Sequence, residues 1–150
     1  MNMDKTDRVV LSHMQADASL SVAELAELAA ISKSACWRRI QKLEAAGVIK
    51  QQVTLLDAGK LNLGLTVFVS IKTNQHNAQW AQQFRHVVED VAGVMEVYRM
   101  GGDVDYLMKV VVADMPDYDR LYQQLITADL FEVTASFVME EILSTTALPL

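Results

Sequence analysis

Two predicted helices separated by only two residues constrain the fold of this 150-residue chain more than any other feature. Ser21 and Glu24 have the S-x-x-E spacing of a capping box, so we expect the first helix over residues 21–29. Its buried stripe is expected to consist of Leu25, Leu28 and Ala29. The second helix is expected over residues 32–46, with Gly47 as the left-handed residue that ends it. Two helices joined by so tight a turn are typical of a helix-turn-helix.

The second of these helices has one apolar face and one basic face. Cys36, Ile40 and Leu43 recur at the i, i+4, i+7 spacing of a buried stripe. Either Ser32 or Ser34 caps its N-terminus. The opposite face presents Ser32, Lys33, Ser34, Trp37, Arg38, Gln41 and Lys42.

Charge is distributed unevenly along the chain. The formal net charge is −6, yet residues 1–60 hold 8 Lys and Arg against 7 Asp and Glu, whereas residues 61–150 hold 5 against 12. Within residues 31–50, five cations face a single acidic residue, Glu44. Neutralising phosphates requires clustered cations and not a basic average, so this stretch predicts a small DNA-contacting surface on an acidic protein.

A predicted first helix over residues 4–15 and a predicted two-stranded wing over residues 48–56 complete a winged helix-turn-helix domain over residues 1–60. In such a domain the helix at 32–46 enters the major groove of double-stranded DNA with its basic face toward bases and phosphates. The alternative is an ordinary three-helix bundle with a solvated basic face. The helix-turn-helix, the basic face of its second helix and the wing occur together, and this combination favours DNA binding.

Two residues of the 32–46 helix each have two interpretations. Trp37 stands among cations, so its ring either packs beneath the wing, which we favour, or contacts sugars and methyl groups of DNA. Cys36 is expected to be a small buried hydrophobe. The alternative, a thiol sensor, requires exposure and a low pKa.

After a linker around residues 57–62 the pattern becomes mixed. Alternating apolar residues predict strands over residues 65–73, 94–100, 106–113 and 132–140. Apolar stripes at helical spacing predict helices around residues 80–91 and 118–125. The order β-α-β-β-α-β predicts a ferredoxin-like domain over residues 61–150, and the fold class is α+β. Such a unit places both helices on one face of its sheet, so we expect a second copy of the chain to cover the other face in at least a homodimer.

The loop that joins the two middle strands, residues 100–106, is a candidate ligand site. Gly101 and Gly102 permit positive φ and expose backbone N–H groups that can bind a carboxylate. Asp103 and Asp105 could bind the ammonium group of the same amino acid. The alternative is a glycine hairpin with solvated carboxylates, which spacing alone favours. Likewise, the alternating hydroxyls of the last strand could line a polar pocket, but the pattern favours a solvated face.

No catalytic or metal-binding arrangement is evident. His13, His76 and His86 are dispersed, and the chain has no paired cysteines, phosphate loop or nucleophile elbow. We therefore expect no enzyme, no metal and no cofactor. Without a long apolar run, an initial signal peptide or a possible disulfide, we expect a cytoplasmic protein that does not contact the membrane.

The chain resembles the Lrp/AsnC (leucine-responsive, or feast/famine) family of regulators from end to end. The resemblance rests on Asp4-x-x-Asp7, Leu25-Ala26, Trp37-Arg38-Arg39-x-x-x-Leu43-Glu44-x-x-Gly47-Val48-Ile49, Leu56-Asp57, Leu63-Gly64, Gly101-x-x-x-Asp105-Tyr106, Tyr118, Leu121 and Thr145-Thr146-x-Leu148-Pro149. Within the family, Ala35-Cys36-Trp37, His76 and Trp80 look most like the branch that responds to cysteine.

The resemblance implies a winged helix-turn-helix followed by a RAM/ACT-like effector domain, in dimers that assemble to tetramers or octamers. It implies a sequence-specific transcriptional regulator of amino-acid metabolism, modulated by a free amino acid of the cysteine, leucine or methionine type. The implied effector site is formed by Met100, Gly101, Gly102, Asp103, Asp105 and Tyr106, with Thr134 and Ser136 from a neighbouring subunit. The alternative function is an oligomeric DNA-wrapping protein with little effector dependence.

Overall fold

The computed structural model describes residues 2–150 and divides into two compact units. One unit is the chain up to Leu55 together with Leu143–Leu150, and the other is Leu56–Ile142. The predicted domain boundary after residue 60 falls inside the second unit. Residues of the described part form no helix that is long and apolar enough to cross a bilayer.

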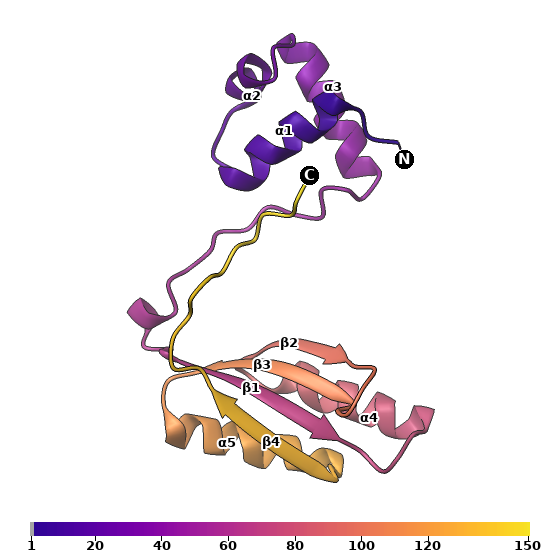
Figure 1. Cartoon of the computed structure of the whole chain (residues 1–150), viewed down its shortest axis with the longest axis vertical. Helices are drawn as coiled ribbons and strands as arrows, with labels where there is room; N and C mark the ends of the chain where they lie inside the picture. Colours follow the sequence, from indigo (N-terminus) through magenta and orange to yellow (C-terminus); the bar gives the residue numbers. More distant parts are fainter. Residues whose placement is uncertain (1) are drawn as a thin grey trace. The chain divides into compact units, whose positions relative to one another are not determined.

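Three helices build the first unit (Figure 1): α1 (Lys5–Ala16), α2 (Val22–Leu28) and α3 (Lys33–Ala45). The predicted capping box of α2 is present, with Ser21 accepting from the N–H of Glu24 and the Glu24 carboxylate accepting from that of Ser21. Asp4 and Asp7 form a second box at the start of α1. Ser32, and not Ser34, caps α3. Val10, Leu25, Ala26, Cys36 and Ile40 form the core of the unit.

The turn between α2 and α3 is held by a left-handed residue. Ala30 adopts φ +53°, and the N–H of Ile31 then donates to the carbonyl of Ala26 at 2.9 Å. The prediction that Leu28 belongs to the buried stripe is wrong: Leu28 is 50% exposed, and Ala26 is buried instead. Ala26 belongs to the core cluster that contains Cys36 and Ile40 of α3, whereas Leu28 lies outside that cluster.

The predicted two-stranded wing does not form. Residues 48–56 contain no strand, and Val53, Leu55 and Leu56 are exposed. This stretch contains no Gly, Asn, Asp or Pro from which a tight hairpin turn is built. A lone hairpin is also marginally stable without a third strand to pair with.

The second unit confirms the predicted β-α-β-β-α-β order. Its elements are β1 (Leu65–Lys72), α4 (Ala78–Asp90), β2 (Val94–Arg99), β3 (Tyr106–Val112), α5 (Met115–Leu125) and β4 (Glu132–Phe137), with short 3-10 turns at Gly59–Leu61 and Ile126–Ala128. The strands form one antiparallel sheet in the order β2-β3-β1-β4. Asn77 and Asp114 cap the two α-helices.

The helices α4 and α5 cover one face of this sheet (Figure 1). Alternate residues of β1 and β3, such as Val69 and Met108, are fully buried beneath them. The other face carries Phe68 and Tyr98, which are exposed. The prediction that β4 extends to residue 140 is wrong: its pairing with β1 ends at Phe137 opposite Val67, and only the N–H of Val138 bonds further, to the carbonyl of Thr66.

One charged contact fixes α3 against the start of α1. The Arg39 guanidinium donates to Asp4 at 2.7 Å and to Asp7 at 2.6 Å, and the Asp7 side chain is buried. The N–H of Asp7 and then Arg39 lower the pKa of the Asp4 carboxyl, and hydrogen bonds to Asp4 and Asp7 raise the pKa of Arg39. Arg39 therefore orients α3 and is not part of its free basic face.

Arg39→Ala should destabilise the helical unit, because it leaves the buried Asp7 carboxylate with the N–H of Asp4 alone. We expect the free energy of unfolding to fall by about 1–3 kcal/mol, measured by urea titration followed at 222 nm. The matched control is Arg38→Ala, whose side chain is exposed and should change stability by less than about 0.5 kcal/mol. Equal losses in both variants would contradict the assigned role of Arg39.

Candidate nucleic-acid interface and ligand pocket

The predicted basic face of α3 is exposed along its whole length. Cys36, Ile40 and Leu43 are buried as predicted, which turns the other side of the helix outward. All seven predicted contact residues are exposed: Ser32, Lys33, Ser34, Trp37, Arg38, Gln41 and Lys42. Their exposure leaves them available to a ligand as large as a nucleic-acid duplex.

The cations of this face are not neutralised by acidic neighbours. Within residues 2–150, Lys33, Arg38 and Lys42 form no ion pair, whereas Arg39 forms two. The Gln41 side chain donates a hydrogen bond to the Glu44 carboxylate at 2.9 Å. Free cations grouped on one helix face are suited to phosphate groups.

Trp37 does not pack beneath a wing, so the favoured interpretation of its role is wrong. Its side chain is 54% exposed. With Val22, Ser32, Lys33 and Ser34 it lines an open hollow beside the start of α3. Residues 48–56 form no strand, and none of them lines this hollow.

Cys36 lies in the core of the first unit, as predicted. It is fully buried, and burial raises the pKa of its thiol. A redox-sensing cysteine requires the opposite on both counts, an accessible sulfur and a lowered pKa. The geometry therefore favours the small buried hydrophobe.

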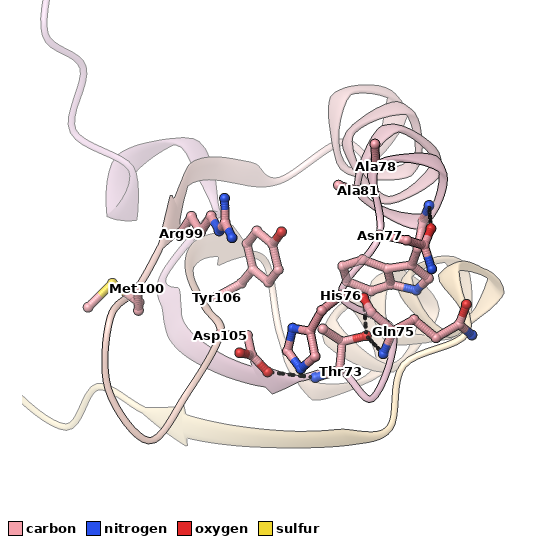
Figure 2. A pocket seen from close by; sticks show the side chains of 11 residues that line it. Thr73, Gln75, His76, Asn77, Ala78, Ala81, Arg99, Met100, Asp105 and Tyr106 are labelled. Carbon is pink, nitrogen blue, oxygen red and sulfur yellow. Dashed lines mark hydrogen bonds between the residues drawn. The ribbon is translucent and has the colours of Figure 1, made fainter.

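A cavity of about 330 Å³ lies in the second unit, where β1 ends and β3 begins (Figure 2). Its polar character comes from a cation, a carboxylate, an imidazole and several amides and hydroxyls. It is lined by Thr73, Gln75, His76, Asn77, Ala78, Trp80, Ala81, Arg99, Met100, Asp105 and Tyr106. Figure 2 shows Arg99 and Tyr106 on one side of this space and Asn77 on the other.

Asp105 is held firmly at the base of the cavity. Its Oδ2 atom accepts from the N–H of Thr73 at 2.9 Å, and its own N–H donates to the carbonyl of Ile71 at 2.9 Å. Its carbonyl accepts from the N–H of Met100 at 2.8 Å, so the glycine loop closes on the same residue. Within residues 2–150, the second carboxylate oxygen of Asp105 has no hydrogen-bond donor and is available to a ligand.

An aromatic wall gives the cavity a rigid apolar side. The Trp80 ring stacks on Phe84 at 5.2 Å, and Tyr106 lies 4.6 Å from Phe84 and 5.7 Å from Trp80 between ring centroids. Trp80 Nε1 donates to the carbonyl of Ala128 at 2.9 Å, which fixes the indole. A site whose walls are fixed in advance binds with a smaller ordering cost.

The structure gathers some of the predicted effector residues and separates others. Met100, Asp105 and Tyr106 line the cavity. Three other residues of the loop are exposed and lie outside the cavity: Gly101, Gly102 and Asp103. Gly102 has φ +149°. Thr134 and Ser136 are exposed on the face of the sheet that α4 and α5 leave free, opposite Ser70 and Phe68. Within one protomer these two hydroxyls are not part of the cavity.

Sequence reasoning missed most of the polar lining, including Thr73, His76, Asn77 and Arg99. A signal was present: polar residues 74–77 directly follow the first predicted strand. Finding the site required the pairing of Ile71 with Tyr106, which brings the end of β1 beside the start of β3. The described residues contain no group of His, Cys, Asp and Glu side chains arranged to hold a metal ion.

Comparison with known proteins gives a match in each unit. A family model described as the Lrp/AsnC ligand binding domain matches residues 66–148, and one described as winged helix-turn-helix DNA-binding matches residues 3–50. The glutamate uptake regulatory protein of Zymomonas mobilis is 47% identical over 99% of this chain and 91% of its own length. The DNA-binding transcriptional activator DecR of Escherichia coli is 44% identical over 99% of both chains. The crystal structure of a transcriptional regulator of Neisseria meningitidis in complex with L-Met has a TM-score of 0.93 at 31% identity, covering 99% of this chain and 97% of that one.

Cys36 should resist thiol reagents in the native protein, because it is fully buried and its pKa is raised. If exposure requires an opening that costs about 3 kcal/mol, labelling by a disulfide reagent at pH 8 should be roughly a hundredfold slower than in denaturant. The absorbance of the released thiol measures both rates. Labelling of the native protein at the denatured rate would revive the sensor interpretation.

Proposed function

We propose, from the premise that this chain belongs to the Lrp/AsnC family of DNA-binding transcriptional regulators, that it binds specific sites on double-stranded DNA through α3. The family is one of regulators and not of enzymes, as the sequence predicts. We further propose that an amino acid held in the cavity of the second unit modulates this binding. The regulated genes belong to amino-acid metabolism, and the protein acts in the cytoplasm. The similarity to a protein named for the regulation of glutamate uptake supports a role in regulating amino-acid genes.

The observation that carries the DNA-binding proposal is the exposed, unpaired basic face of α3. Lys33, Arg38 and Lys42 are free to neutralise phosphates, and Ser34 and Gln41 can form hydrogen bonds with base edges. In a helix-turn-helix the second helix enters the major groove with its N-terminal residues closest to the bases. The order of α2 and α3 and the tight turn between them support that assignment.

The effector proposal rests on an arginine and a carboxylate that line one small cavity. Arg99 and His76 are exposed cavity residues that can bind an α-carboxylate. The free oxygen of Asp105 can accept from an α-ammonium group. The wall of Trp80 and Tyr106 then offers contact to an apolar or sulfur-containing side chain. A ligand of the cysteine, leucine or methionine type satisfies all three, and the bound L-Met of the neisserial regulator supports this class.

We propose that the predicted effector residues outside the cavity, the glycine loop and the hydroxyls of β4, come together only when several copies of the chain associate. The free face of the sheet carries exposed Phe68 and Tyr98, and we propose that a second copy of the chain covers it. Such a homodimer, assembling further to a tetramer or octamer, is the means by which Thr134 and Ser136 approach the Gly101, Gly102 and Asp103 loop of another subunit.

Arg38→Ala should abolish binding to a promoter fragment while leaving oligomer size unchanged, because Arg38 is exposed and unpaired on the DNA face. Fluorescence anisotropy over a salt series should give a log–log slope near −0.9 per phosphate neutralised. The matched control is Arg85→Ala, an exposed arginine of α4 in the other unit, which should bind as the parent does. A salt-independent affinity, or equal affinity for Arg38→Ala and the parent, would overturn the proposal.

A melting-temperature screen against the twenty amino acids should identify the effector, since a ligand that binds only the folded protein stabilises it. At a hundredfold excess over the dissociation constant the gain is about 2.7 kcal/mol, or a rise in Tm of roughly 5–10 °C. Arg99→Ala and Asp105→Asn should abolish the shift.

Asp119→Ala is the matched control, because Asp119 is an exposed carboxylate of α5 outside the cavity and the glycine loop. If Asp103→Ala abolishes the shift and Arg99→Ala does not, the ligand binds at the loop and not in the cavity. If no amino acid shifts the Tm although DNA binding is retained, the alternative of a DNA-wrapping protein is favoured.

A further inference from the structure

We propose that Trp37 is a specificity-determining residue that contacts the 5-methyl group of a thymine in the major groove. This inference rests on the proposed binding of DNA through α3 and adds a chemical feature of the operator. It concerns the open hollow formed by Trp37 with Val22, Ser32, Lys33 and Ser34.

The first argument is the exposure of the indole. The chain's other tryptophan, Trp80, is 3% exposed and donates a hydrogen bond from its Nε1 atom, whereas Trp37 is 54% exposed. No acceptor within residues 2–150 bonds the Trp37 Nε1 atom. A large aromatic surface left in water on a binding helix is typical of a contact residue, since Trp is enriched in binding hot spots.

The second argument is position. Residues three and four apart on a helix are neighbours, so Trp37 shares one face with Ser34 and Lys33 at the N-terminal end of α3. This end of the second helix is the part that approaches base edges in a helix-turn-helix. Val22, at the start of α2, adds an apolar side to the hollow.

The third argument is chemical complementarity. The hollow is apolar, and its surroundings are cationic, with Lys33 lining it and Arg38 adjacent to Trp37 in sequence. The thymine methyl group is the apolar feature that the major groove displays, and it is flanked by phosphates. An apolar contact between cations therefore matches a methyl group between phosphates.

The test removes that methyl group alone. An operator is first selected from a randomised duplex pool with the full-length protein, and each thymine is then replaced singly by deoxyuridine. We expect one or two positions per half-site at which the parent binds roughly threefold to fivefold more weakly, as for the loss of one buried methyl group. In Trp37→Ala the thymine-to-uracil ratio at those positions should fall to about one. In Trp37→Phe, which keeps an apolar ring, part of the ratio should return.

The outcomes separate this inference from the proposed function. If the parent binds the operator, loses binding in Arg38→Ala, and discriminates against uracil nowhere, the Trp37 inference is overturned and the proposed function stands. If Trp37→Ala keeps the parent's ratio at the sensitive positions, another residue contacts the methyl group and the inference is again wrong. If the pool yields no operator because the parent binds no duplex, both fail. Melting temperatures of the two Trp37 variants within about 2 °C of the parent would exclude misfolding, as expected for an exposed side chain.

Discussion

The contact of Arg39 with Asp4 and Asp7 reinforces the orientation that burial of Cys36, Ile40 and Leu43 gives to α3. Arg38 and Arg39 are adjacent in sequence and point in different directions around the helix. Because Arg39 is bound to two carboxylates at the start of α1, α3 cannot rotate without breaking charge-assisted hydrogen bonds at a buried aspartate. The same contact leaves Arg38 and Trp37 exposed. The orientation of the proposed DNA-binding face therefore depends on the buried apolar stripe together with a cation that does not belong to that face.

A comparable constraint builds the cavity of the second unit. Thr73 and Asp105 are separated by 32 positions, yet the antiparallel pairing of β1 with β3 makes them hydrogen-bonding neighbours. The hydrogen bond from the N–H of Met100 to the carbonyl of Asp105 then closes the glycine loop beside Arg99. Sheet register, and not any single motif, brings an arginine and a carboxylate to one polar space with an aromatic wall.

Local signals explain which parts of the structure could be predicted from the sequence. The caps at Ser21 and Ser32 and the stripe through Cys36 depend on residues within one or two turns, and these predictions are confirmed. Whether residues 48–56 pair, where β4 ends, and whether Leu28 or Ala26 packs against α3 depend on partners distant in sequence. The cavity was only half predicted for the same reason: the glycine loop has a sequence signature, but Arg99 and His76 acquire a role only when strand ends meet.

The separation of the two sites limits how an effector can act in the proposed mechanism. All residues of the cavity belong to the second unit and all residues of the α3 face to the first. A ligand shifts an equilibrium only by its difference in affinity between two states of the protein. In this mechanism the two states differ in the surroundings of the ligand site. A different association of subunits at the free sheet face would produce such a difference, because it would change the surroundings of both Thr134 and the glycine loop. A coupling of about 1–3 kcal/mol is enough to change DNA affinity by one to two orders of magnitude.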